Sequence, residues 1–172
     1  MDVLVMKLVV EPLNTGVHAR EYFSNSEPTI EEFLKKRANK ECKLNISDTF
    51  VLVNEDKREQ ILGYFTLSLH SIVLKNIPAD IAKKIPYPEI GTVLLGRMGK
   101  DQNLTPRGFG QIILKEALKE SLSRGSFFAL ELHAKNVALI SYYKKFGFIQ
   151  LMDSPLHMIL PRKQIVKACN TD

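Results

Sequence analysis

The chain has 172 residues, of which 45% are hydrophobic and 25% are charged. This is ordinary globular usage, which excludes a collagen-like or intrinsically disordered chain, and the length predicts one domain. The formal net charge of +5 gives the protein a mild attraction to polyanions.

The composition also constrains location and redox chemistry. No apolar run approaches the roughly 20 residues that cross a bilayer, and the first ten residues carry Asp2 and lack the parts of a signal peptide. Cys42 and Cys169 stand far apart without CxxC spacing, so neither a disulfide nor a metal site is predicted. A reducing, cytoplasmic setting is therefore expected, with no membrane partner. The histidines share no motif, and we expect them to be structural or solvated: His18, His70, His133 and His157.

In the first half of the chain, hydrophobic periodicity predicts strands around one helix. The helix is expected over Thr29–Lys43, with Thr29 as N-cap, Glu32 in the capping-box position, and Phe33 and Leu34 as core anchors. The polar segment 54–60 reads as the turn of a hairpin. The expected strands are Val3–Val10, Thr49–Val53 and Ile61–Leu69, followed by a proline-broken loop over Leu74–Ile90 with a short helix at Ala79–Lys84.

The stretch Thr92–Leu122 organises the second half. Val93–Leu95 has the pattern of a buried strand, a loop is expected from Gly96 onward, and an amphipathic helix follows with Leu114, Leu118 and Leu122 on one face. Further on we expect a strand at Phe127–His133, a helix at Val137–Phe146 and a strand at Met158–Leu160. The domain is expected to span residues 1–161, and residues 162–172 are expected to be a loose C-terminal tail.

The segment Arg107–Gly110 joins the loop to this helix. The first backbone N–H groups of a helix are unpaired and attract anions, and glycines let a phosphate approach the backbone closely. Arg107 adds a charged donor. By local pattern alone, an ordinary glycine-containing turn is an equally good interpretation.

The motif RMGKD, followed by TPRGFG and an amphipathic helix, resembles the acetyl-CoA-binding core of the GNAT superfamily of N-acetyltransferases. The family pattern is [Q/R]xxGxG/A, which Gly108 and Gly110 match, whereas Thr105 departs from it. The resemblance implies an α/β (α+β) fold with a mixed, mostly antiparallel sheet flanked by helices and splayed between its two central strands. It also implies acetyl-CoA as co-substrate, bound at Met98, Gly99, Lys100, Thr105, Arg107, Gly108, Phe109, Gly110 and Asn136.

Softer similarities, from FSNSEP at residue 23 to YKKFGF at residue 143, resemble the acetyltransferase toxins of bacterial toxin–antitoxin pairs. Those enzymes acetylate the α-amino group of aminoacyl-tRNA and are held in check by a ribbon-helix-helix antitoxin. Asp48 stands where the subgroup tends to carry a basic residue. The oligomeric state is left open, a homodimer included.

Tyr143 lies at the place of the family's FYxxxGF tyrosine, and the resemblance therefore implies that it protonates the departing CoA thiolate. Packing at the rim of the core is the alternative for Tyr143, and capping of the following helix is the alternative for Asn136. Arg97 is expected to face a substrate phosphate or a packing carboxylate. Basic residues of the first helix are tentative tRNA contacts, a solvated helix face being the other interpretation: Lys35, Lys36, Arg37 and Lys40.

Three functions remain open from the sequence. The first is a toxin that acetylates aminoacyl-tRNA, the second an N-acetyltransferase for a protein N-terminus or small amine, and the third a catalytically silent CoA-binding or partner-binding module.

Overall fold

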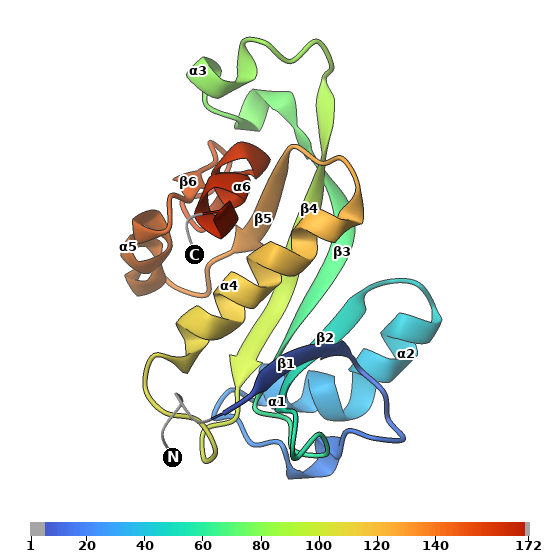
Figure 1. Cartoon of the computed structure of the whole chain (residues 1–172). Coiled ribbons are helices and arrows are strands. Elements are labelled where there is room, and N and C mark those ends of the chain that lie inside the picture. Colours follow the sequence, from blue (N-terminus) through green and yellow to red (C-terminus); the bar gives the residue numbers. More distant parts are fainter. Residues whose placement is uncertain (1–5, 171–172) are drawn as a thin grey trace. The chain divides into compact units, whose positions relative to one another are not determined.

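The computed structural model describes residues 6–170. The strands of this part of the chain form a seven-stranded sheet in the order β1-β2-β3-β4-β5-β7-β6. Pairing is antiparallel for β1 with β2, β2 with β3, β5 with β7 and β6 with β7, whereas β4 and β5 are parallel. This confirms the predicted mixed, mostly antiparallel sheet flanked by helices (Figure 1). The strands are β1 (Leu8–Pro12), β2 (Asp48–Asn54), β3 (Gly63–Val73), β4 (Glu89–Lys100), β5 (Ala129–His133), β6 (Ile149–Gln150) and β7 (His157–Pro161).

The helical segments lie between these strands in the sequence. They are η2 (Arg20–Tyr22), α1 (Pro28–Glu32), η3 (Phe33–Arg37), α2 (Ala38–Lys43), η4 (Leu74–Asn76), α3 (Ala79–Ala82), α4 (Phe109–Ser121), η5 (Leu122–Arg124), α5 (Ala138–Lys145) and α6 (Arg162–Asn170). No helix among residues 6–170 is long and apolar enough to cross a membrane.

The chain divides into two compact units. The first contains the residues up to Ser68 together with Gly96–Ala117, and the second contains Leu69–Leu95 together with the residues from Leu118 onward. The expectation of one domain over residues 1–161 stays a prediction.

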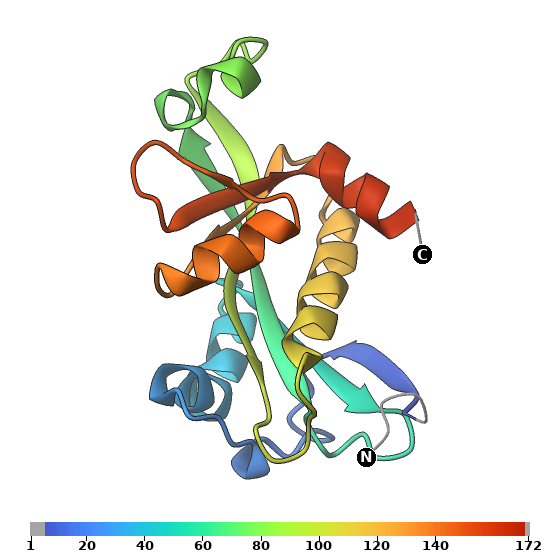
Figure 2. The same ribbon diagram turned by 90° about the vertical axis from the view of Figure 1, so that its left-hand side faces the viewer.

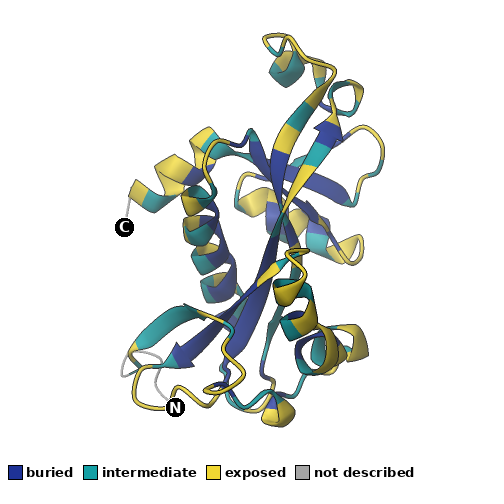
Figure 3. Ribbon diagram, turned by 90° about the vertical axis from the view of Figure 1, so that its right-hand side faces the viewer, coloured by how far each residue is buried: buried dark blue, intermediate teal, exposed yellow. Residues whose placement is uncertain are grey.

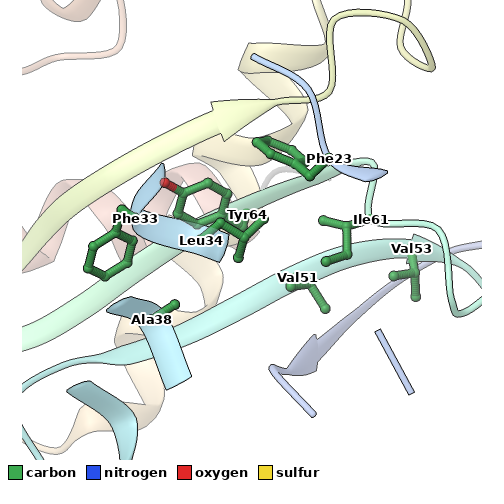
Figure 4. Close-up of a cluster of buried hydrophobic side chains, with 8 residues drawn as sticks. All are labelled: Phe23, Phe33, Leu34, Ala38, Val51, Val53, Ile61 and Tyr64. Atoms are coloured by element: carbon green, nitrogen blue, oxygen red, sulfur yellow. The ribbon is translucent and has the colours of Figure 1, made fainter. Parts of the chain in front are cut away.

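The core of the first unit is an aromatic and aliphatic cluster beneath the first helical segment (Figure 4). Phe33 and Leu34 are 2% and 0% exposed, which confirms them as core anchors. The Tyr64 ring lies between the two phenylalanines, edge-on to Phe23 and stacked with Phe33, and its hydroxyl donates to the Ile30 carbonyl at 2.6 Å. β2 is buried along most of its length (Figure 3), which fits the apolar run Phe50–Val53.

The first helical segment begins earlier than predicted. Pro28 occupies the first helical turn and Glu27 precedes it as N-cap, so Thr29 is not the cap. Proline favours this position because its fixed φ suits a helix and its missing N–H needs no partner there. The backbone stays helical to Lys43, with a π-helical turn at Phe33–Arg37.

Most remaining predictions on elements hold with shifted ends. The first strand is observed at Leu8–Pro12, and the part of the prediction at residues 3–5 lies outside the described residues. The hairpin between β2 and β3 and the short helix at Ala79–Ala82 are confirmed.

The loose tail predicted after residue 161 is wrong. In the second unit, β7 leads directly into α6 (Figure 2), and Ile165 on that helix is fully buried. Arg162 lies over the Phe127 ring at 4.6 Å and donates to the Gly125 carbonyl. These contacts hold the segment against the rest of the second unit.

The loop predicted from Gly96 is also wrong, because β4 continues to Lys100. A Cβ added at Gly99 would lie 2.4 Å from Ile30 Cγ2. The glycine is therefore needed for the close approach of strand and helix, and it does not mark a turn. β4 and β5 pair over Thr92–Leu94, and β4 runs on for six residues beyond Leu94.

Candidate active site

The loop that precedes α4 is built around the buried carboxylate of Asp101. Its Oδ1 accepts from the N–H groups of Asn103 and Leu104 at 2.8 and 2.9 Å, and its Oδ2 accepts from the Ser24 N–H at 2.9 Å. Asp101 is 1% exposed. A carboxylate in this position holds the turn 101–104 and joins it to the segment that precedes α1. The RMGKD motif contains Asp101, but the sequence interpretation assigned no role to its side chain.

Three further contacts hold this loop and the end of β4 in place. The Thr105 hydroxyl donates to the Asp101 carbonyl at 2.5 Å, so the residue that departs from the family pattern closes the turn. The Lys100 ammonium donates to the Pro106 carbonyl at 3.2 Å, which places a positive charge beside Arg107. Asn25 Nδ2 donates to the Lys100 carbonyl at 2.9 Å and fixes the end of β4.

One of the predicted phosphate-binding residues, Gly108, adopts a conformation that only glycine takes easily. Gly108 has φ of +83°, and α4 begins at the next residue, Phe109, whose side chain is 1% exposed. A Cβ added at Gly108 or Gly110 would meet no heavy atom within 4 Å. The space above both glycines is therefore open, and the exposed Arg107 lies next to it. The Phe109 and Gln111 N–H groups are directed to the Pro106 and Gly108 carbonyls at 3.4 and 3.1 Å. Open space at a helix N-terminus with neighbouring cations suits a pyrophosphate.

Tyr143 lies in the second unit, near the end of α5. It is 9% exposed, and its ring packs edge-on against Tyr142 at 5.3 Å and Phe148 at 5.5 Å. Gly147, with φ of +97°, ends the helix, and the Phe148 N–H then returns to the Tyr143 carbonyl at 3.2 Å. Burial raises the pKa of the Tyr143 hydroxyl above its ordinary value of 10, so the hydroxyl stays protonated.

Asn136 also lies in the second unit and is exposed. Its Oδ1 accepts from the Leu139 N–H at 3.2 Å, which is the capping interaction considered from the sequence. This contact uses only the side-chain oxygen, so the side-chain nitrogen of Asn136 can still donate to a ligand.

The predicted tRNA contacts separate into two groups. Lys35, Lys36 and Lys40 line a shallow depression of about 430 Å³ in the first unit, together with Arg20 and Lys43, which the sequence interpretation had left out. Arg37 does not line it.

The helix moderates the charge of this cluster. Lys35 pairs with Glu31 at 3.4 Å, Lys36 with Glu32 at 3.7 Å, and Arg37 with Glu41 at 2.8 Å, each four residues along the helix. Such exposed pairs are weak, so the lysines can exchange these partners for a phosphate at little cost.

Arg97 is half-buried on β4, and its guanidinium lies 4.1 Å from the centre of the Phe33 ring. Its N–H donates to Thr66 Oγ1 at 2.9 Å. Aromatic stacking was neither of the two environments predicted for this side chain.

The chain matches no protein-family model. It is 25% identical over 166 residues to a probable toxin TacT of Sinorhizobium fredii, which covers 90% of this chain and 91% of that protein. It is 26% identical over 144 residues to a tRNA-acetylating toxin of Mycobacterium tuberculosis, with 82% and 84% covered. The chain has the GNAT fold and is similar to the acetyltransferase toxins.

Solved structures of such toxins superpose on nearly the whole chain. A tyrosine-to-phenylalanine mutant of KacT matches with a TM-score of 0.84 at 25% identity, covering 94% of this chain and 98% of that one. AtaT complexed with acetyl-methionyl-tRNAfMet matches with a TM-score of 0.82 at 26% identity, covering 95% and 99%. AtaTR bound with acetyl-CoA matches with a TM-score of 0.78 at 26% identity, covering 94% and 98%.

Proposed function

We propose that this protein is an acetyl-CoA-dependent N-acetyltransferase that acetylates the α-amino group of aminoacyl-tRNA, as a toxin does. The observation that carries the proposal is the full-length similarity to AtaT complexed with acetyl-methionyl-tRNAfMet. The tRNA-acetylating toxin of M. tuberculosis supports the same substrate class.

Acetyl-CoA is the co-substrate, and the first unit supplies the residues for its phosphates. The pyrophosphate accepts from main-chain N–H groups at the start of α4, over Arg107–Gly110, beside the cations of Arg107 and Lys100. Thr105 holds the turn rather than contacting the phosphate, since its hydroxyl is bonded to Asp101. Met98 and Gly99 line the pantetheine arm through the main chain of β4. For Asn136, in the second unit, a bond to the pantetheine stays a prediction from the family resemblance.

The chemistry requires few protein groups. The α-amino group has a pKa of about 7.7 to 8.0, so a useful fraction is neutral near pH 7.5 and can attack the thioester carbonyl. As the C–N bond forms and the C–S bond breaks, Tyr143 gives its proton to the thiolate. The proton released from the nitrogen restores the phenol through solvent. The raised pKa of Tyr143 keeps this proton in place until charge develops on sulfur.

The tRNA backbone meets basic groups of the first unit. The depression lined by Arg20, Lys35, Lys36, Lys40 and Lys43 gathers positive charge that suits consecutive phosphates. Arg97 is a further candidate for a phosphate contact, because stacking on Phe33 orients its guanidinium. Arg37 makes its own pair with Glu41 and is the weakest of the predicted contacts.

The reaction places the protein where aminoacyl-tRNA is made, in the cytoplasm. The toxin resemblance also implies a ribbon-helix-helix antitoxin as partner. An N-acetyltransferase for protein N-termini or small amines uses the same acetyl-CoA site and differs only in the acceptor.

Salt dependence separates these acceptors. If tRNA phosphates meet the basic depression, the KM for aminoacyl-tRNA rises steeply between low and moderate salt, because each neutralised phosphate releases counterions. A small amine acceptor shows little such change. A KM for aminoacyl-tRNA that is independent of salt contradicts the proposed contacts. Binding of acetyl-CoA without acetylation of any acceptor favours the silent module.

A further inference from the structure

Glu131 carries a carboxylate in the buried interior of the second unit. It lies on β5 and is 0% exposed. The Thr92 hydroxyl donates to its Oε2 at 3.1 Å, His70 Nδ1 lies 2.7 Å from the same oxygen, and His157 Nε2 lies 2.8 Å from Oε1. A buried carboxylate is costly unless charged or metal partners surround it. Nothing in the proposed acetyl transfer uses this group.

Strand register adds a third histidine. Glu131 and His133 are two residues apart on β5, so their side chains point to the same face of the sheet. His133 pairs with His157 across β5 and β7, and the two imidazole rings stack with centroids 4.2 Å apart. Glu131, His133 and His157 each offer one ligand atom, and these atoms lie within 4.8 Å of one another.

A second layer of contacts orients the histidine at the centre. Asp153 Oδ2 lies 2.8 Å from His157 Nδ1, and Glu131 Oε1 lies 2.8 Å from Nε2, so the ring donates from both nitrogens to the two carboxylates. A metal ion that binds Nε2 displaces the proton shared with Glu131, while Nδ1 keeps its bond to Asp153. A carboxylate behind a histidine in this way fixes the ring and the tautomer of a metal ligand. The Thr92 hydroxyl, which donates to Oε2, orients the Glu131 carboxylate.

The cluster is also reachable from solvent. His133 is exposed, and the His70 side chain is 49% exposed. In a tetrahedral zinc site, with bonds of about 2.0 to 2.1 Å, the ligand atoms lie roughly 3.3 Å apart. Small side-chain rotations are therefore enough to bring the three ligand atoms around one ion. Imidazole with one carboxylate is a donor set for zinc, nickel or copper rather than for magnesium or calcium.

We propose that Glu131, His133 and His157 form a binding site for a divalent transition-metal ion. This differs from the sequence interpretation, which predicted no metal ligands and treated each histidine separately. The site ties β5 to β7, and its ligands come from one unit of the chain. It is independent of the proposed acetyl transfer.

The test is calorimetric titration of the full-length chain with ZnCl2, after removal of any affinity tag and of bound metal with a chelator. The Cys42→Ser and Cys169→Ser changes remove the two free thiols, which would otherwise take up zinc. We expect saturation at about one ion per chain and a rise in the melting temperature with zinc.

The variants decide whether this cluster binds the ion. His133→Ala removes an exposed ligand and should not disturb folding; it is expected to weaken zinc binding by at least about tenfold, as is Glu131→Gln. Asp153→Asn is expected to weaken it about tenfold through the orientation of His157. Asp80→Asn, an exposed carboxylate in the same unit, is the matched control and should have no effect. The proposal is overturned if zinc does not saturate the chain below about 1 mM, or if His133→Ala binds zinc as well as the parent chain.

Discussion

The Arg97 guanidinium lies 4.1 Å from the centre of the Phe33 ring, and Arg37 lies 5.7 Å from the same ring. The two arginines therefore share one aromatic platform but differ in their other partner, because Arg37 also pairs with Glu41. Replacing Arg97 and Arg37 one at a time therefore compares their roles in tRNA binding.

Arg97→Ala is expected to raise the KM for aminoacyl-tRNA by roughly tenfold, since it removes the oriented charge that we propose binds a tRNA phosphate. Acetyl-CoA affinity should not change. Arg37→Ala removes the same charge and is expected to change the KM by less than about twofold, because the exposed Arg37 pair contributes little. Steady-state kinetics with charged tRNA measures both values. Equal effects of the two changes would show that Arg97 has no specific part in tRNA binding.

Gly108→Ala is expected to weaken acetyl-CoA binding by about tenfold or more, because it distorts the N–H groups that hold the pyrophosphate and places a Cβ in the open space above them. Gly125→Ala is the matched control, since Gly125 has a similar φ of +81° and open space around it. Both changes should cost about 1 to 3 kcal/mol of stability through backbone strain. Calorimetry with acetyl-CoA distinguishes them, and a similar loss of affinity in both variants would remove the pyrophosphate from this loop.

Tyr143→Phe removes only the hydroxyl, so we expect kcat to fall by about 10² to 10⁴ while acetyl-CoA affinity stays nearly constant. Tyr142→Phe deletes the neighbouring hydroxyl and is expected to keep most of the activity. Single-turnover acetylation rates for both variants provide the measurement. Full activity of Tyr143→Phe would mean that water or another group protonates the thiolate.

Alkaline pH provides a second test of Tyr143. Burial raises the pKa of this hydroxyl above 10, so the acid stays protonated up to that pH. The rate with the parent chain should therefore not decline between pH 8 and pH 9.5 through loss of this proton. A decline in that interval that disappears in Tyr143→Phe would contradict the assigned pKa direction.

His18 makes stability depend on pH in the first unit. It is 2% exposed, its Nδ1 accepts from the Asn14 N–H at 2.9 Å, and Glu11 lies 3.5 Å from Nε2. Desolvation lowers the pKa of His18 below 6.5, against the opposing pull of Glu11. The unfolded chain therefore takes up this proton first, and the stabilisation present above pH 6.5 is lost as pH falls through the folded pKa.

Urea unfolding at pH 7.5 and at pH 5.5 measures this effect. The free energy of unfolding should fall more steeply with acid in the parent chain than in His18→Asn, which keeps a short acceptor and does not titrate. An equally steep fall in the variant would assign the acid sensitivity to other groups.

The sequence predicted those parts of the fold that local pattern determines. Leu114 and Ile113 lie on the buried face of α4 as their periodicity indicated, and both are at most 1% exposed. Gly99 was misread because the sequence does not show that Ile30 approaches it closely. The α6 helix was missed because its main anchor is a single buried residue, Ile165.

The candidate site likewise contains residues that a motif identifies and residues that only the fold brings together. The glycine loop and Tyr143 carry motifs and could be named in advance. Arg20 joins the basic depression from a separate segment, and no spacing rule connects it to Lys40. Likewise, the groups around Glu131 come from β3, β4, β5 and β7, and only the sheet register brings them together.

The central claim is tested most directly by the product of the reaction. Purified chain is incubated with acetyl-CoA and a charged tRNA pool, and the amino acids attached to tRNA are analysed by mass spectrometry, with Tyr143→Phe and uncharged tRNA as controls. The account predicts N-acetylated aminoacyl-tRNA with the parent chain, very little with Tyr143→Phe, and none with uncharged tRNA. The claim is contradicted if aminoacyl-tRNA stays unmodified while a peptide N-terminus or small amine is acetylated readily under the same conditions.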